Sequence, residues 1–495
     1  MNTVHTSTQN QNRSDPLQSP GKWHALAELM AIRGQDGLAP GELSMTGNDP
    51  FFPTPYRVGE TAAASLAAIG VAANDLWEIK TGLRQQIHID VAHAAATLRT
   101  VDYTRALNQD EQYVHVPIPT AMSHMLGVTQ PWPTKDGHWL LPHLNLPHLS
   151  RRVLDVLRCE DTPAAVRQAV SGWDGVALED AIAGAGACGG MIRSPQEWLE
   201  HPQGRYLAER PVIEITKISD TATEQLHRGD RPLSGVRVLD LTRILAGPVA
   251  GRALAEHGAD VLMVGAEGLP QTPEHVRDTS HGKRSCFLNI QEASQAEELR
   301  TLVSQADVFI NGYRPGRLAA HGFSVEDLVA QRPGLVVVSV SCFGSGGPWA
   351  SRAGWEQVAQ AVTGICQTNG LLTQNGQPKL VFAPLCDYTT GYLAALGAML
   401  ALARRAREGG SYHVQVSLCQ SAMFVQRQGL LESFASAPGH LTEDELEKLH
   451  VQANTCYGQL KTLGPVLKMS STAPRWDRPS PRLGSDAALW LPRQH

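Results

Sequence analysis

Short apolar runs alternate with helical patterns between residues 235 and 341, and no other feature constrains the fold as strongly. The runs are "GVRVLDLT" (235–242), "ADVLMVG" (259–265), "SCFLNI" (285–290), "ADVFING" (306–312) and "GLVVVSVS" (334–341). Helical patterns lie between them, most clearly at 291–306 and 324–331. Because strands joined by helices cross over in one hand, such a series builds a parallel sheet covered on both faces. The sequence therefore predicts an α/β fold with a doubly wound, Rossmann-like sheet, whose ligands bind beyond the carboxyl ends of the strands.

A weaker repeat relates an early segment of the chain to a late one. Gly70 lies in "SLAAIGVAAN" and Gly397 in "YLAALGAMLA", and at the same offset Gly82 corresponds to Gly409. In each copy a small-residue helix, a charged helix end and a glycine precede an alternating strand, "QIHIDV" or "YHVQVS". The shared order and spacing indicate a diverged internal duplication. No βαβ series precedes Gly70, so we expect the first copy to be truncated.

Composition excludes several classes of function. The formal charge of −6 and the pI near 6.3 argue against binding to nucleic acid or to an anionic membrane. No apolar run reaches the ~18–20 residues of a membrane span, and the polar N-terminus has no signal core. The eight cysteines are too dispersed for a zinc ribbon or a disulfide framework. We therefore expect a cytoplasmic enzyme with reduced thiols and no metal.

The familiar cofactor and nucleophile motifs are absent from the sequence. The turn after the first strand reads "RILAGP" and contains no G-x-G-x-x-G, so a permanently bound dinucleotide is disfavoured. Neither an ATP-binding P-loop nor a G-x-S-x-G nucleophile elbow occurs. His143 and His148 lack the spacing of a metal pair on one helix.

A series of turns nevertheless resembles one known family. In order along the chain it reads "LSGVRVLDLTRILAGPVAG", "GKRSCFLNI", "ADVFINGYRPGRLAAHGF", "VVVSVSCFGSGGP", "GWEQVAQAVTG" and "DYTTG". This series is similar to the family III coenzyme A transferases (the CaiB/BaiF family), strongly over about 235–425 and weakly over 54–100 and 103–210. The resemblance implies the family III fold, and the chain looks like a truncated copy fused ahead of a second copy.

The resemblance also suggests a domain organisation, in which the polar stretch "ISDTATEQLHRGDRP" is the best candidate for a linker. We expect a disordered tail (1–24), a truncated family-like region with a smaller α/β domain (25–217), the linker (218–233), the Rossmann-like CoA-binding and catalytic domain (234–430) and a C-terminal return segment (431–495).

The resemblance implies that Asp387, in "DYTTG", is the catalytic nucleophile. In the family this carboxylate attacks an acyl-CoA thioester to give a mixed anhydride, and an aspartyl-CoA thioester follows. Coenzyme A and acyl-CoA are then substrates, exchanged with a carboxylic acid, and no cofactor is permanently bound. From its position alone, Asp387 could instead be an N-cap of the helix predicted over 388–405, a role worth about 1 kcal/mol. The glycine-rich "FGSGGP" (343–348) could cover the site against water.

The resemblance suggests the CoA contacts as well. Basic side chains would bind the phosphates, and Tyr313 would lie against the adenine. For each basic residue a solvated surface position is the alternative. The predicted CoA-binding residues are Arg243, Leu245, Ala246, Gly247, Lys283, Arg284, Tyr313 and Arg314.

Several departures from the family pattern leave alternatives open. Gly265, Asn289 and Asn311 replace residues common in the family, which allows a non-catalytic CoA-binding paralogue. Trp355 stands where the racemase branch has a histidine, so an acyl-CoA racemase or isomerase is disfavoured. Glu60, the counterpart of Asp387 in the first copy, lacks the D-x-x-T-G context and is either a second acid or a remnant. Family members form interlocked dimers, so we expect a homodimer, or a monomer completed by the fused copy.

Overall fold

The computed structural model describes residues 22–35, 37–382 and 384–493. The tail predicted over 1–24 therefore lies almost wholly outside the described residues. Its last three residues begin helix α1 (Lys22–Arg33).

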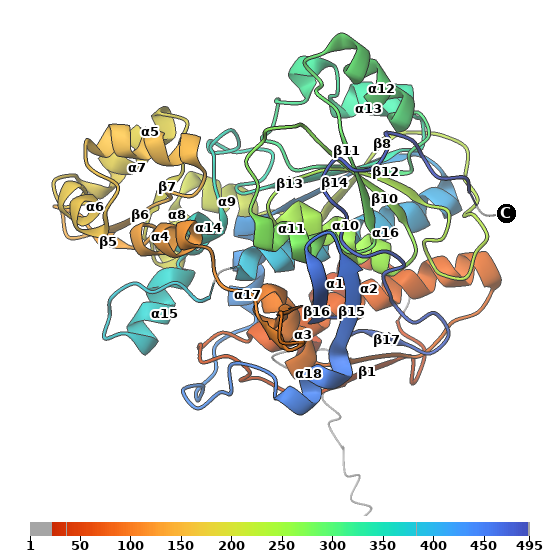
Figure 1. Cartoon of the computed structure of the whole chain (residues 1–495), viewed down its shortest axis with the longest axis horizontal. Coiled ribbons are helices and arrows are strands. Elements are labelled where there is room, and N and C mark those ends of the chain that lie inside the picture. Colours follow the sequence, from red (N-terminus) through yellow and green to blue (C-terminus); the bar gives the residue numbers. More distant parts are fainter. Residues whose placement is uncertain (1–21, 36, 383, 494–495) are drawn as a thin grey trace, which may run out of the picture.

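A seven-stranded sheet forms the centre of the molecule (Figure 1). Its order is β11-β10-β9-β12-β13-β14-β8, and every neighbouring pair is parallel except β14 and β8. The chain order reverses between β9 and β12, as in doubly wound nucleotide-binding folds. The predicted α/β sheet is thus confirmed. The strands are β8 (Glu214–Ser219), β9 (Arg237–Leu241), β10 (Asp260–Gly265), β11 (Lys283–Phe287), β12 (Val308–Asn311), β13 (Val336–Ser341) and β14 (Ser411–Ser417).

Helices cover both faces of this sheet because its strands are apolar on both sides. Val238 of β9 packs into the core that contains α10 (Ala246–Glu256) and α16 (Leu385–Glu408). The next residue along, Leu239, belongs to a second core beneath α12 (Ala293–Val303) and α13 (Val325–Gln331). In Figure 1 the latter two helices lie above the sheet, while α10 and α16 lie below it.

Helix α2 (Val58–Thr81) packs against α16, and the two helices have equal length. A strand and a helix follow each of them: β2 (Ile87–Asp90) with α3 (Val91–Ala96), and β14 with α17 (Leu418–Arg427). A Cβ atom on Gly70 would lie 2.9 Å from the side chain of Ile87, and one on Gly397 would lie 2.4 Å from that of Val414. In both segments the absence of a side chain at the glycine therefore allows the helix to pack closely against the next strand.

Among the described residues, α16 alone has the length and composition of a membrane span, but its apolar stretch is entirely buried inside the protein. This burial is that of a core helix, packed between the sheet and α2.

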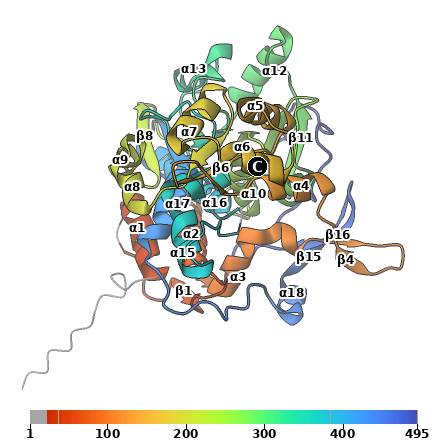
Figure 2. The ribbon, with the colours of Figure 1, turned by 90° about the vertical axis from the view of Figure 1, so that its left-hand side faces the viewer.

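A small lobe stands beside the sheet (Figures 1 and 2). Its core of residues such as Val128, Leu140 and Ile182 is separate from the two cores of the main body. It is the smaller α/β unit expected from the sequence. It contains a sheet of β5 (Trp132–Pro133), β6 (Trp139–Pro142) and β7 (Gly189–Met191), with helices α4 (Thr120–Val128), α5 (Pro147–Leu157), α6 (Pro163–Val170) and α7 (Gly175–Gly184). Helices α8 (Pro195–Glu200) and α9 (Pro202–Ala208) follow the lobe and bury Trp198 and Leu207 in the core of the main body.

The chain leaves the small lobe through β8, which joins the edge of the large sheet. This strand runs across the boundary predicted between 217 and 218, so the irregular segment begins only after Ser219. The boundary was misplaced because "EITKIS" is too short and polar to stand out as a strand.

The remaining elements connect distant parts of the chain. Residues after 463 return along the large sheet, where the amide of Gly282 donates to the carbonyl of Arg478 (2.9 Å). A three-stranded sheet joins β1 (Leu43–Thr46), β2 and β17 (Lys468–Met469), and a four-stranded one joins β3 (Arg105–Leu107), β4 (Tyr113–His115), β15 (His450–Thr455) and β16 (Gly458–Leu463). The other helices are η2 (Thr97–Tyr103), α11 (Pro273–Thr279), η3 (Ala319–His321), α14 (Glu356–Thr363), α15 (Ile365–Thr373) and α18 (Glu443–Leu449).

Candidate active site

Asp387 lies in the first turn of α16, as its third residue. The backbone amide of Asp387 donates to Glu356 Oε2 at 2.6 Å, so Glu356 supplies the cap of this helix. The alternative role of Asp387 as an N-cap is therefore wrong, because the helix begins at Leu385, three residues earlier than predicted. Its carboxylate is left to face open space at the positive end of the helix dipole.

Gly391 brings a second helix terminus to Asp387. A Cβ atom on Gly391 would lie 2.6 Å from the carbonyl oxygen of Ala246 and equally close to Val249, both in the first turn of α10. Glycine is thus required one helical turn after Asp387, and this explains the end of the D-x-x-T-G pattern in physical terms. The amino ends of α10 and α16 consequently lie side by side.

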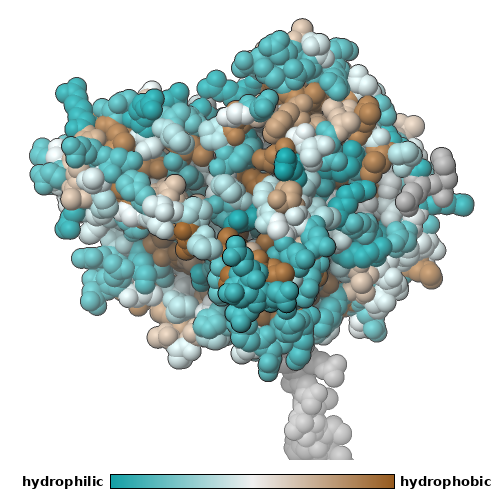
Figure 3. All heavy atoms as spheres, viewed as in Figure 1, coloured by the Kyte–Doolittle hydropathy of each residue, from teal (hydrophilic) through white to brown (hydrophobic). Residues whose placement is uncertain are grey.

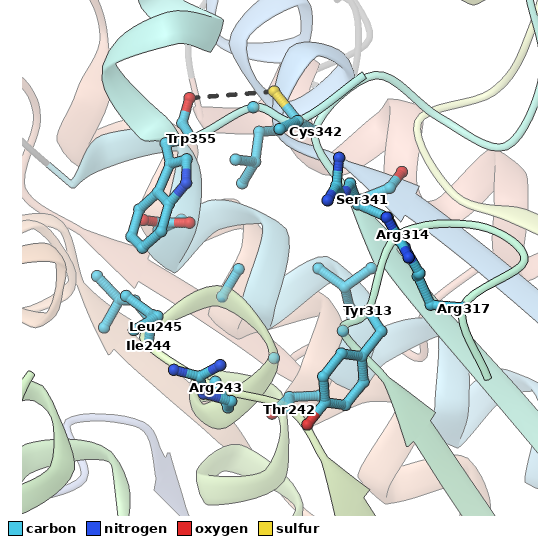
Figure 4. Close-up of a pocket in the computed structure, with 18 of the residues that line it drawn as sticks. Thr242, Arg243, Ile244, Leu245, Tyr313, Arg314, Arg317, Ser341, Cys342 and Trp355 are labelled. Carbon is cyan, nitrogen blue, oxygen red and sulfur yellow. Dashed lines mark hydrogen bonds between the residues drawn. The ribbon is translucent and has the colours of Figure 1, made fainter. Parts of the chain in front are cut away.

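The first cavity, of about 410 Å³, lies at the carboxyl ends of β9, β12 and β13 and contains Asp387. In Figure 4, Arg243 and Ile244 lie on one side, Tyr313 and Arg314 on another, and Trp355 at the far end. The small lobe closes the cavity with Leu146, His148 and Leu149. Of the predicted CoA-binding residues, those that line it are Arg243, Leu245, Ala246, Gly247, Tyr313 and Arg314.

The first cavity is electropositive. Arg314 is half-buried and Arg317 exposed, and neither side chain has an ion-pair partner in the described part of the chain. Arg243 donates to the carbonyl of Pro270. Burial, together with the nearby guanidinium groups of Arg152, Arg243 and Arg314, lowers the pKa of His148. The cavity therefore favours an anionic ligand.

A second cavity, of about 610 Å³, meets the first at Asp387. Ile244, Trp355 and Asp387 line both cavities. Ile244 has a φ of +73°, a conformation that costs a β-branched residue free energy. This strained turn stands directly beside the carboxylate. The nucleophile candidate thus lies between two separate binding spaces.

The half-buried Asp387 and the buried Glu356 form an acid pair. Both carboxylate oxygens of Glu356 are engaged, one by Asp387 N and the other by Gln360 Nε2 at 2.7 Å. Burial and the adjacent charge of Glu356 raise the pKa of Asp387 well above its usual range, and burial raises the pKa of Glu356. Because the two groups titrate together, the measurable pKa values belong to the pair.

Replacement of Glu356 by glutamine is expected to move the acidic limb of the pH profile of kcat/KM to lower pH. The neutral amide removes the charge that raises the pKa of Asp387, so the reactive carboxylate persists in more acidic solution. Steady-state rates across the pH range test this. Glu60→Gln is the matched control, since Glu60 is also buried in the first turn of its helix but lines neither cavity. An unchanged limb in Glu356→Gln would contradict the assignment.

A network of buried hydrogen bonds fixes the first turn of α16 through the residue that follows Asp387. Asp278 Oδ2 accepts from Tyr388 Oη (2.9 Å), Thr100 Oγ1 (2.6 Å) and Arg252 Nη1 (2.9 Å). All four side chains are buried. The network ties α16 to α10, α11 and η2, and so fixes the residue that follows Asp387.

Lys283 and Arg284 require a correction, because neither lines the first cavity. Lys283 is 1 % exposed and donates to Asp240 Oδ2 and to the carbonyl of Pro248, each at 2.7 Å. Arg284 pairs with Asp260 and donates to the carbonyl of Leu489. Both basic groups are used inside the fold, where they join strands and the C-terminal segment.

The glycine-rich segment 343–348 also differs from expectation. It lines neither of the two cavities, and Gln203 of α9 holds it by donating to the carbonyls of Phe343 (2.7 Å) and Gly346 (2.9 Å). The chain just after it, from Ala350 to Trp355, is what borders the first cavity. Glu60 pairs with Arg57 at 3.1 Å and lines neither cavity.

Sequence reasoning missed Glu356 and Arg317. Glu356 directly follows Trp355 in the "GWEQ" segment, and an acid at this position was the local signal for a second carboxylate at the site. Arg317 follows the "RPG" turn three residues after Arg314, and the spacing could have pointed to it. The residues that line the second cavity form no recognisable sequence motif.

The chain shares sequence similarity with named CoA transferases. Residues 233–458 match the family model "CoA-transferase family III". The chain is 29 % identical to an acyl-CoA transferase of Gibberella moniliformis over 88 % of each chain. It is 32 % identical to the succinate–glutarate CoA-transferase of Agrobacterium fabrum over 40 % of this chain and 54 % of that one.

Among solved structures, a CaiB/BaiF family protein from Brucella suis is 28 % identical, with a TM-score of 0.37 over 47 % of this chain and 65 % of that chain. The chain thus spans less than two thirds of that structure, and about half of the Agrobacterium relative. The family match covers strands β9 to β14 of the large sheet and the candidate nucleophile. Residues 233–458, which contain Asp387, are thus similar to CoA-transferase family III.

Proposed function

We propose that the protein transfers coenzyme A between an acyl-CoA and a carboxylic acid, with Asp387 as the covalent nucleophile. The observation that carries the proposal is the place of Asp387, where a basic cavity at the carboxyl edge of the sheet meets a second, largely apolar cavity. The names of the relatives support CoA transfer between an acyl-CoA and an acid. The position of Asp387 between the two cavities adds an explanation of how one carboxylate can react with both the acyl-CoA and the carboxylic acid.

The proposed reaction proceeds through four exchanges at carbonyl carbon. Asp387 attacks the thioester carbonyl, CoA thiolate leaves, and an acyl-aspartyl anhydride forms. The thiolate then attacks the aspartyl carbonyl, which releases the first carboxylate and leaves an aspartyl-CoA thioester. The acceptor carboxylate attacks this thioester to give a new anhydride and thiolate. Attack of the thiolate on the acceptor's carbonyl releases the new acyl-CoA and restores Asp387.

Two helix termini support these steps. Each attack places negative charge on a carbonyl oxygen, and amide donors at a helix amino end stabilise such a charge. Gly391 brings the amino end of α10 against α16, so both termini are close to the reacting carboxylate. The high pKa of Asp387, caused by burial and Glu356, also makes its carboxylate more basic than an exposed one.

We assign CoA to the first cavity. Arg243 and Arg314 would bind its phosphates, Tyr313 would lie against the adenine, and the turn of Leu245, Ala246 and Gly247 would border the pantetheine arm. This assignment leaves Lys283 and Arg284 out, since both have partners in the fold.

Arg314→Ala is expected to raise the KM for acyl-CoA by roughly 10- to 100-fold with little change in kcat. The guanidinium contributes a charge-assisted hydrogen bond to a phosphate that does not react, so its loss weakens binding and leaves the chemical step intact. Steady-state kinetics with varied acyl-CoA measure this. Arg300→Ala, an arginine of α12 outside the cavities, is the control. A fall in kcat with an unchanged KM would contradict the assignment.

We further propose that the chain descends from an internal duplication and that only the second copy is catalytic. Glu60 donates its backbone amide to Asp49 at 2.8 Å, as Asp387 does to Glu356, but the carboxylate of Glu60 is paired with Arg57. The N-terminal region also supplies the lobe that closes the CoA cavity, which supports a self-contained monomer. A dimer mass in light scattering would contradict the monomer.

The proposed function is tested with a panel of acyl-CoA donors and carboxylic acid acceptors, with each new acyl-CoA detected by mass spectrometry. The proposal predicts exchange in at least one donor–acceptor pair. CoA binding without exchange across the panel would favour a non-catalytic paralogue, and loss of configuration at the α-carbon without exchange would favour a racemase.

A further inference from the structure

The second cavity has two unlike walls. One is apolar and comes from the loop after β4 and from α4. In Figure 3 apolar side chains show in a hollow between the small lobe and the main body. The opposite wall is polar and comes from α11, with Glu274, His275 and Arg277. The apolar residues include Val116, Pro117, Ile118, Met122, Met125 and Leu126.

Glu274 is the unusual member of the polar wall. Its residue is 8 % exposed, and neither carboxylate oxygen has a hydrogen-bond partner among the described residues. Other buried acids in this region are satisfied: Asp278 accepts three hydrogen bonds and Glu356 accepts two. A desolvated carboxylate without a donor costs free energy, so its presence at a cavity indicates a donor that is supplied by a ligand.

The neighbouring groups restrict the kind of donor. Arg277 and Arg99 line the same cavity, and Arg99 is paired with Asp102. The half-buried Arg277 has no acidic partner in the described part of the chain. Its positive charge beside Glu274 disfavours an ammonium group, whereas a neutral hydroxyl can donate to the carboxylate without repulsion.

We propose that the second cavity binds the acyl group and that Glu274 accepts a hydrogen bond from a hydroxyl on that group. The preferred substrates are then hydroxylated carboxylic acids with an apolar body, or their CoA thioesters. The apolar wall holds the carbon chain, Asp387 meets the carboxyl or thioester end, and Glu274 meets the hydroxyl. This assignment rests on the proposed function, because it takes Asp387 as the reacting group.

The test compares pairs of acceptor acids that differ only by one hydroxyl. Short- to medium-chain acids are used, with the hydroxyl moved stepwise along the chain, and kcat/KM is measured with the donor that the panel identifies. For the best hydroxyl position we expect a preference of roughly tenfold or more over the unsubstituted acid. No preference at any position, or a larger preference for the matching amino acid, would overturn the proposal.

Variants of Glu274 then test whether this residue causes the preference for the hydroxylated acid. Glu274→Leu is expected to abolish it, because the hydroxyl would lose its acceptor in an apolar setting, and Glu274→Gln retains a part through its amide oxygen. Asp102→Asn is the matched control, since it removes a carboxylate of the same cavity that already has a partner. Survival of the preference in Glu274→Leu would overturn the assignment.

Thermal unfolding separates this role from a structural one. Loss of a buried, unpartnered carboxylate is expected to raise the unfolding temperature in Glu274→Leu. A lower unfolding temperature with unchanged selectivity would mean that Glu274 serves only the fold. Absence of all turnover and of any covalent adduct in the wild type would instead contradict the proposed function.

Discussion

Asp387→Ala is expected to lower the rate of CoA transfer by about 10³-fold or more, because the reaction loses the group that forms its covalent intermediates. Steady-state turnover with the best donor and acceptor measures the loss. Glu60→Ala, at the corresponding position of α2, is the control and is expected to keep turnover near the wild-type rate. Turnover that survives in Asp387→Ala would contradict the proposed mechanism.

Asp387→Asn separates loss of chemistry from loss of folding. Burial and Glu356 raise the pKa of Asp387 in the folded state, so the ionised form is disfavoured there. The stability contribution of this group is therefore present below the pKa of the unfolded chain and is lost as pH rises through the folded pKa. We expect the inactive asparagine variant to unfold at a higher temperature than the wild type at neutral pH. The difference should shrink in acid.

Arg252→Met is expected to lower the free energy of unfolding by about 3–5 kcal/mol, because it leaves Asp278 as a buried carboxylate without its cation. Arg252 and Asp278 are both 2 % exposed, and their atoms are 2.9 Å apart. Urea denaturation measures the loss. Activity should also fall, since Asp278 anchors Tyr388 beside the nucleophile.

The double variant Arg252→Met with Asp278→Asn supplies the control. Removal of both charges is expected to cost less than the sum of the two single changes, because no uncompensated charge remains. Additive losses, or a loss below about 1 kcal/mol in Arg252→Met, would show that the pair does not stabilise the fold in this way.

The sheet domain was predictable from sequence because its signals are local and repeated. Every strand predicted between 235 and 341 is present, although β11 begins at Lys283 rather than at 285. Asp387 was placed at the start of its helix, and six of the eight expected CoA contacts line one cavity with it. These residues sit in turns at strand ends, where chain order alone brings them together.

The failures concern side chains whose partners are distant in sequence. Lys283 pairs with Asp240, 43 residues away, and this partner turned an expected phosphate contact into a buried structural contact. Glu356 meets Asp387 across 31 residues of chain. Glu274 belongs to a cavity assembled from α11 and the segment before α4, for which no spacing rule exists. Pairings of this kind depend on tertiary packing rather than on local pattern.

The most direct test of the central claim is to trap the aspartyl intermediate. The protein is incubated with a reactive acyl-CoA and hydroxylamine, and the modified residue is located by intact-mass and peptide mass analysis. The account predicts a hydroxamate on Asp387 that requires acyl-CoA and is absent from Asp387→Asn. A hydroxamate on another carboxylate, or one that persists in Asp387→Asn, would contradict the claim that Asp387 is the nucleophile.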